Sequence, residues 1–152
     1  MKSNEDHPRR KTYLPMILWA VALCLLLPLP GVFWDDSASE DTLVRLMLLL
    51  TLPAIDTLML IIHFGDYAYW INGGPTFEQC CAATREQRRG YTGAHLRVFA
   101  WASAFCAVEL LVSWALNLPF WLDVIAFCAI LIVAALRTLP IHFSDYDPNR
   151  NA

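Results

Sequence analysis

Two acidic residues, Asp56 and Glu109, stand near the middle of long apolar runs. An ionisable side chain at the centre of a membrane span costs at least about 2.5–3.5 kcal/mol to insert, so it usually faces other helices or water. Two carboxyls at similar depth could share a proton or take a cation, and we expect both to face inward from neighbouring helices. The alternative is that each carboxyl is a hydrogen-bonded packing residue. His63 follows Asp56 by about two helical turns on the same face, which suits a proton path or simply an interfacial anchor.

Small or weakly polar residues accompany Glu109 at helical spacing: Ala102, Cys106 and Ser113. Residues of this kind let membrane helices approach one another closely. The stripe therefore favours the interpretation of Glu109 as a packing residue.

One basic and one acidic residue, Arg45 and Asp123, stand close to the same predicted side of the second and fourth apolar runs. We expect them to form an ion pair between these two helices. Partly sheltered pairs set register and orientation more reliably than they add net stability. We interpret this pair as structural.

Adjacent cysteines, Cys80 and Cys81, suggest redox or metal chemistry, because two soft ligands and a histidine could hold a thiophilic metal. Neighbouring cysteines, however, form only a strained disulfide. The chain has five cysteines, three of them inside apolar runs, which does not indicate a disulfide framework. We expect no metal, no cofactor and no enzymatic activity, since no residue spacing indicates nucleophilic catalysis.

The segment between the second and third apolar runs, residues 65–97, is the only long polar stretch inside the chain. Thr76 and Gln79 match a capping box, which predicts a short helix from there to Arg89, closed by Gly90.

That short helix would be amphipathic, with Phe77, Cys81 and Thr84 on one face. Its basic residues, Arg85, Arg88 and Arg89, would then be available to lipid headgroups or to an acidic partner at the membrane surface. The alternative is a solvated loop helix that only joins two hairpins.

The composition places the chain among membrane proteins. Of its 152 residues, 57 % are apolar and 16 % are charged, against roughly 45–50 % and 25 % in soluble domains. We predict four membrane spans, each about the 20 residues that a bilayer requires: 14–34, 43–64, 98–118 and 119–139. The first run is longer than the roughly 7–15 apolar residues of a signal peptide, so we expect it to remain as a span.

Basic residues predict the orientation. Apart from Arg45, they occur in the tail 1–13, in the linker 65–97 and at the end of the chain from Arg137 onward, whereas the two predicted outer loops contain none. The positive-inside rule therefore places both termini and the linker in the cytoplasm.

We therefore expect a single, all-α, polytopic membrane domain over residues 1–152, with four transmembrane helices in two hairpins around a short cytoplasmic amphipathic helix. The absence of an N-x-S/T glycosylation site favours a bacterial inner (cytoplasmic) membrane. The basic residues form no patch that would indicate nucleic acid.

The expected function is binding, with the lipid bilayer and a membrane protein or a second copy as partners, as in an accessory subunit or an immunity or exclusion protein. Two alternatives stay open. One is a small cation- or proton-coupled transporter or channel subunit using Asp56 and Glu109, and the other is a thiol- or metal-handling protein using Cys80 and Cys81.

Overall fold

The computed structural model describes residues 10–33 and 39–148, and this part of the chain is helical without strands. The helices are α1 (Leu14–Leu26), α2 (Leu29–Phe33), α3 (Glu40–Phe64), α4 (Phe77–Ala82), α5 (Arg85–Ala115) and α6 (Phe120–Thr138), with two 3₁₀ turns, η1 (Ala68–Trp70) and η2 (Phe143–Tyr146). Four stretches are long and apolar enough to cross a membrane: Leu14–Phe33, Glu40–Phe64, Arg85–Ala115 and Phe120–Thr138. The protein is thus a multi-pass membrane protein, as its composition predicts.

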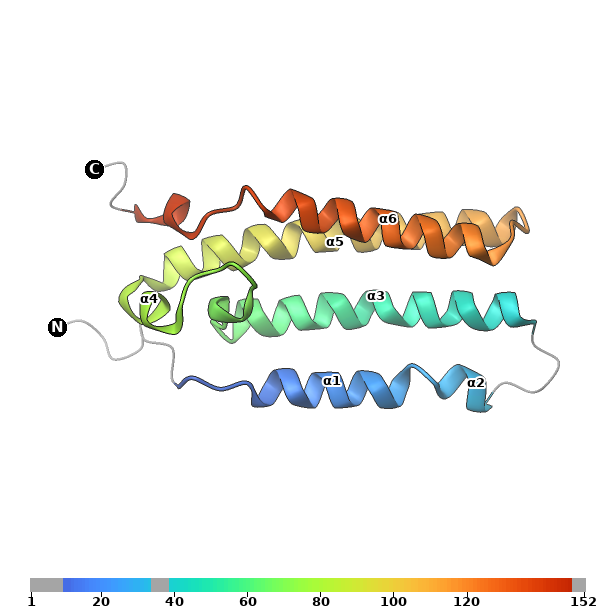
Figure 1. The fold of residues 1–152 in the computed structure, drawn as a ribbon, viewed down its shortest axis with the longest axis horizontal. Coiled ribbons are helices and arrows are strands. Elements are labelled where there is room, and N and C mark those ends of the chain that lie inside the picture. The colour runs from blue at the N-terminus through green and yellow to red at the C-terminus, as the bar shows by residue number, and fades with distance from the viewer. Residues whose placement is uncertain (1–9, 34–38, 149–152) are drawn as a thin grey trace.

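The long helices α3, α5 and α6 pack against one another, and α1 with α2 lies along α3. Figure 1 shows this arrangement as layers, with α3 between α1 and the α5–α6 pair. The buried core of the three-helix unit contains Leu52, Cys106, Leu110 and Phe127. The small residues Ala102 and Ser113 are also buried, so the stripe beside Glu109 lies in a helix interface.

The first span is broken in two. Its α-helix ends at Leu26, and α2 begins at Leu29 after a turn that contains Pro28. Proline lacks the N–H that would continue the helical hydrogen bonds. The indole Nε1 of Trp19 donates to the backbone O of Ala54 at 2.9 Å, which holds α1 against α3.

The polar linker differs from its prediction. Its short helix, α4, ends at Ala82, and α5 already begins at Arg85 and continues through Gly90 into the third span. Thr84 causes the restart: its backbone is extended and its Oγ1 accepts a hydrogen bond from the N–H of Gln87 at 3.2 Å. The predicted helix over residues 76–89 is therefore wrong beyond Ala82, whereas the capping box of Thr76 and Gln79 is present.

Several segments that are distant in sequence meet at one end of the bundle and form a structure that we call the cap. It consists of η1, α4, the first turns of α5 and η2 (Figure 1). Ala68, Cys80 and Tyr91 form its buried centre, with Phe143 and Tyr146 packed against them. The amide Nε2 of Gln87 donates to the backbone O of Phe143 at 3.2 Å; this bond ties η2 to α5.

Gly90 explains how η2 lies so close to α5. A Cβ atom at this position would stand 2.7 Å from Cδ1 of Tyr146, closer than real Cβ contacts come. Glycine therefore serves here for close approach of an aromatic ring and does not end the helix, although both uses are common for this residue.

We predict that Gly90→Ala lowers the free energy of unfolding by about 1–2 kcal/mol. Overpacking against Tyr146 costs about 1–3 kcal/mol, which exceeds the gain of up to about 1 kcal/mol from helix propensity. Chemical unfolding of the purified protein in detergent, followed by circular dichroism, measures this. In a Tyr146→Ala background the same change should be neutral or stabilising; equal effects in both backgrounds would contradict the proposed contact.

Candidate functional site

A buried ion pair joins α3 to α6. The Nε atom of Arg45 lies 2.6 Å from Oδ2 of Asp123, and the two residues are 4 % and 0 % exposed. The Nη2 atom of Arg45 also donates to the backbone O of Leu118 in the turn between α5 and α6. The pair suggested by the sequence is therefore present, and it also fixes the turn that links the neighbouring helices.

Asp56 finds its partner on α5. Its Oδ1 accepts a hydrogen bond from Oγ of Ser103 at 2.9 Å. Glu109 follows Ser103 by six residues, which places it about 9 Å further along the helix axis and on a different side of it. Helices α3 and α5 are neighbours, as predicted, but the structure does not bring Asp56 and Glu109 together as a pair.

Glu109 belongs instead to a second group of polar residues, far from the cap. It interacts electrostatically with Asp123 and Arg45, and it shares a face of α5 with Ser113. We call these four residues the distal polar cluster. Three buried oxygen atoms in it have no hydrogen-bond partner: Glu109 Oε2, Ser113 Oγ and Asp123 Oδ1.

The charge of the distal polar cluster limits its chemistry. With the carboxyls of Glu109 and Asp123 both ionised, the two negative charges exceed the single positive charge of Arg45 by one. A proton on Glu109 would make the cluster neutral and would turn an acceptor into a donor for a neighbouring oxygen. The arrangement can thus hold a proton, or a small cation that accepts oxygen ligands.

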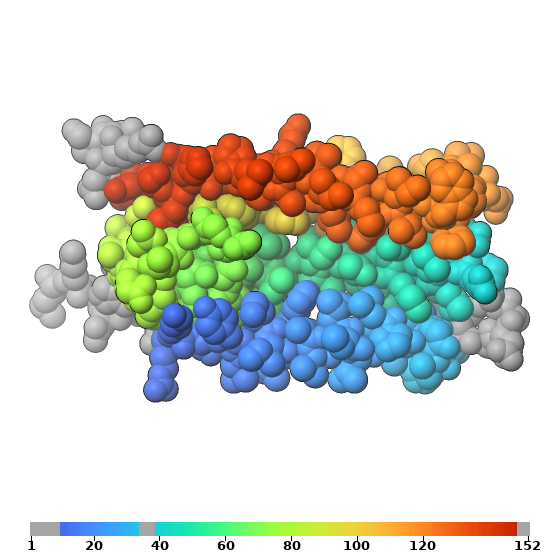
Figure 2. Space-filling model, viewed as in Figure 1, coloured from blue at the N-terminus to red at the C-terminus, as the bar shows by residue number. Residues whose placement is uncertain are grey.

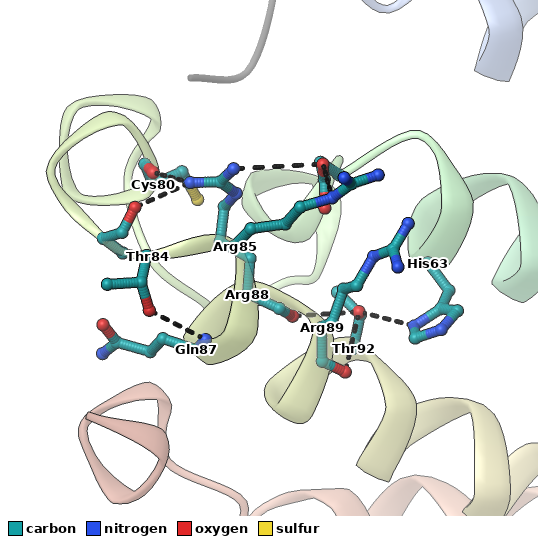
Figure 3. Close-up of polar contacts among 10 residues, drawn as sticks. His63, Cys80, Thr84, Arg85, Gln87, Arg88, Arg89 and Thr92 are labelled. Carbon is teal, nitrogen blue, oxygen red and sulfur yellow. Dashed lines mark hydrogen bonds and ion pairs between the residues drawn. The ribbon is translucent and has the colours of Figure 1, made fainter. Parts of the chain in front are cut away.

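In the cap, the arginines in the first turns of α5, Arg85, Arg88 and Arg89, differ in environment. Arg88 is buried, at 1 % exposure, and its Nη1 donates to the backbone O atoms of Cys80 at 3.0 Å and Ala83 at 2.7 Å. It therefore holds the end of α4 and is not available to headgroups at the surface, contrary to the expectation. The Nε of Arg85 and the Nη2 of Arg88 lie 3.8 and 3.9 Å from Oδ2 of Asp66 (Figure 3).

His63 contacts α5 at Thr92, with Nδ1 2.9 Å from the threonine Oγ1 (Figure 3). That hydroxyl donates to the backbone O of Arg88 at 3.0 Å, so its proton is engaged. His63 must then donate through Nδ1 to this hydroxyl. This contact supports an anchoring role for His63 between α3 and α5.

The two adjacent cysteines of α4 lie in different environments. Cys80 is fully buried, and the loss of hydration raises the pKa of its thiol to about 11. The thiolate, which is the nucleophile and the metal ligand, is therefore scarce at neutral pH. Within residues 10–33 and 39–148, no three His, Cys, Asp or Glu side chains are grouped to hold a metal ion.

Aromatic residues of the linker hold the start of α1, a contact that the sequence analysis missed. The hydroxyl of Tyr69 and Nε1 of Trp70 both donate to the backbone O of Thr12 at 3.0 Å. Tyr67 stacks on Trp70 with ring centroids 4.1 Å apart. The only signal in the sequence was the clustering of these rings at a span end, where aromatic residues are common in membrane proteins.

The surface has hollows, and two of those lined by described residues lie next to the elements discussed above. One, with a volume of about 530 Å³, lies between α1–α2 and α3, where apolar residues including Trp19, Phe33 and Pro53 line it; Figure 2 shows α1 lying loosely along this seam. The other, of about 610 Å³, lies in the cap between α4, α5 and η2, and its lining includes Gln79 and His142.

Neither a protein-family model, nor a curated protein, nor a solved structure matches this chain. The function is therefore argued from its own residues.

We predict that the buried ion pair behaves as a unit. Arg45→Met or Asp123→Leu alone should lower the free energy of unfolding by about 3–5 kcal/mol, because each leaves an uncompensated buried charge. The double variant should lose less than either single variant. Unfolding in detergent measures all three, with the exposed Arg137→Met as a control expected to change stability by less than about 0.5 kcal/mol. Additive losses in the double variant would contradict the pairing.

Proposed function

We propose that this protein is a non-enzymatic component of a bacterial inner membrane that works by binding, with its cap as the recognition surface. Its spans form two hairpins, and its termini and cap are cytoplasmic. The partner is another membrane protein or a second copy, as for an accessory subunit or an immunity or exclusion protein. We name these classes by analogy, because such proteins also consist of a few spans with short loops.

The distribution of charge supports the orientation. Of the basic residues in the described ranges, all except Arg45 lie in or near the cap end: Arg10, Lys11, Arg85, Arg88, Arg89, Arg97 and Arg137. Glu40 and Asp41 open α3 at the other end. Basic residues beside spans remain preferentially in the cytoplasm.

The main support for this proposal is that the cap is held by specific contacts. Contacts between distant segments hold it: Tyr69 and Trp70 bind Thr12, and Gln87 binds Phe143. Membrane-protein loops that only join helices need no such network. At the other end, by contrast, α5 and α6 are joined by a short turn over residues 116–119. A defined polar surface at one side of the membrane suits recognition.

The intramembrane charges further support a binding role. Arg45 is engaged with Asp123, and Asp56 with Ser103, so these costly groups hold helices together. The buried thiol of Cys80 gives little support to thiol or metal handling.

A second candidate function is that of a proton- or cation-coupled subunit, which the three unpartnered oxygens of the distal polar cluster favour. It would use Glu109, with Asp123 and Ser113, and not the pair of Asp56 and Glu109. Ion flux into liposomes that contain only the purified protein, abolished by Glu109→Gln, would favour this candidate over the binding role.

The proposed orientation predicts which positions react with a reagent added from outside the cell. A cysteine at position 37, which lies outside the described residues, should react with a membrane-impermeant maleimide in intact cells. A cysteine in place of Ser144, exposed in the cap, should react only after the membrane is opened. Wild-type protein corrects for the native cysteines. The reverse pattern would place the cap outside and contradict the proposal.

We predict that photo-crosslinking residues at Glu78 and Ser144, both exposed in the cap, give discrete adducts with a membrane protein or a second copy in cells. The same residue at Leu116, exposed at the opposite end, serves as the matched control and should give none. Adducts from Leu116 alone, or from none of the three positions, would contradict recognition by the cap.

A further inference from the structure

The first turns of α5 concentrate positive charge at one edge of the cap. Three of the five residues 85–89 are arginines. The N-terminus of a helix carries about half a positive charge, so cations there are unfavourable and anions favourable. Glu86 supplies a carboxylate in the same turn; it is adjacent in sequence to Arg85 but precedes Arg89 by three residues, so it lies beside Arg89 on the helix and offsets part of its charge.

The protein neutralises this charge only in part. Among the described residues, Asp66 forms ion pairs with the group: its Oδ2 is 3.8 Å from Arg85 and 3.9 Å from Arg88, beyond direct hydrogen-bond distance. Arg88 is engaged with backbone oxygens of α4. The Nε of Arg89 is buried and has no hydrogen-bond partner.

Arg85 and Arg89 stand one helical turn apart and therefore share a face of α5. Figure 3 shows their side chains extending to the same side, with that of Arg89 toward His63. The side chain of Arg85 is 47 % exposed, so an anion can reach it. Guanidinium groups on one face of a helix, near its N-terminus, can donate charge-assisted hydrogen bonds to the oxygens of a phosphate group.

The site lies where the apolar part of α3 ends. Arg89 acts electrostatically on His63, whose ring lies 5.1 Å from the ring of Phe64. Phe64 is 67 % exposed and is the last residue of α3. An exposed apolar ring beside His63, on which Arg89 acts, marks the boundary between acyl chains and headgroups, where lipid phosphates lie.

We propose that Arg85 and Arg89 bind the phosphate of an anionic lipid headgroup at the edge of the cap. This inference rests on the proposed cytoplasmic placement of the cap. The lipid would offset the unfavourable charge at the N-terminus of α5 and would fix the cap relative to the membrane surface. An acidic peptide is less well matched, because it would have to approach to the depth at which Phe64 enters the apolar region.

The test uses the purified full-length protein in an uncharged detergent. Short-chain phosphatidylglycerol should raise Tm by about 5 °C, whereas phosphatidylcholine of equal chain length, inorganic phosphate and a polyglutamate peptide should not. R85Q/R89Q should bind the anionic lipid at least about ten-fold more weakly, since it loses two charge-assisted contacts. The matched control is R137Q, which removes an exposed arginine from the last turn of α6, at the cap end of the bundle. This variant should keep the wild-type shift in Tm.

A measurement on the wild-type protein covers the case in which R85Q/R89Q does not fold. A photoactivatable phosphatidylglycerol should attach to the end of α3 or the first turns of α5. Attachment elsewhere, such as the seam between α1 and α3, would overturn the proposal, as would equal shifts with phosphatidylcholine, phosphate or polyglutamate. If phosphatidylglycerol does not raise the Tm of the wild-type protein while the crosslinks at Glu78 and Ser144 are still formed, the lipid site alone is overturned and the proposed binding function stays intact.

Discussion

A charged side chain inside a bilayer has no water to solvate it, and the packing of α3, α5 and α6 provides polar partners for Arg45, Asp123 and Asp56. The pair of Arg45 and Asp123 joins α3 to α6, and the bond from Ser103 to Asp56 joins α3 to α5. Apolar side chains alone give weak preference for one helix neighbour, because lipid tails are equally apolar. The polar contacts therefore select which helices pack together and in which register.

The position of α1 follows from the same constraint. Its span, residues 14–33, contains no charged residue, so no ion pair draws it into the three-helix unit. It is held by Trp19, which binds the backbone of α3, and near its start by the bonds of Tyr69 and Trp70 to Thr12. Fewer polar contacts leave the apolar hollow between α1 and α3.

Buried polar groups also need partners in the cap, outside the apolar region. Buried backbone oxygens at the end of α4 need donors, and Arg88 supplies them. This use removes one arginine from the surface and leaves Arg85 and Arg89 to define its charge. Three residues that look equivalent in the sequence thus differ in the structure: Arg88 is buried and holds α4, whereas Arg85 is exposed and Arg89 is partly buried.

The sequence by itself determined the helical class, the four spans and the side of the molecule that collects basic residues, because length, apolarity and charge are local properties of a segment. It also indicated the pair of Arg45 and Asp123, since both lie near the same end of their spans. It could not reveal that Asp56 contacts Ser103 and that Glu109 lies near Asp123. Such contacts depend on the rotation and axial offset of packed helices, which only the tertiary structure decides. The same holds for the linker: Thr84 repeated the capping signal of Thr76 in the sequence, but the use of Gly90 for close approach of the Tyr146 ring, and not as a helix end, is seen only in the tertiary structure.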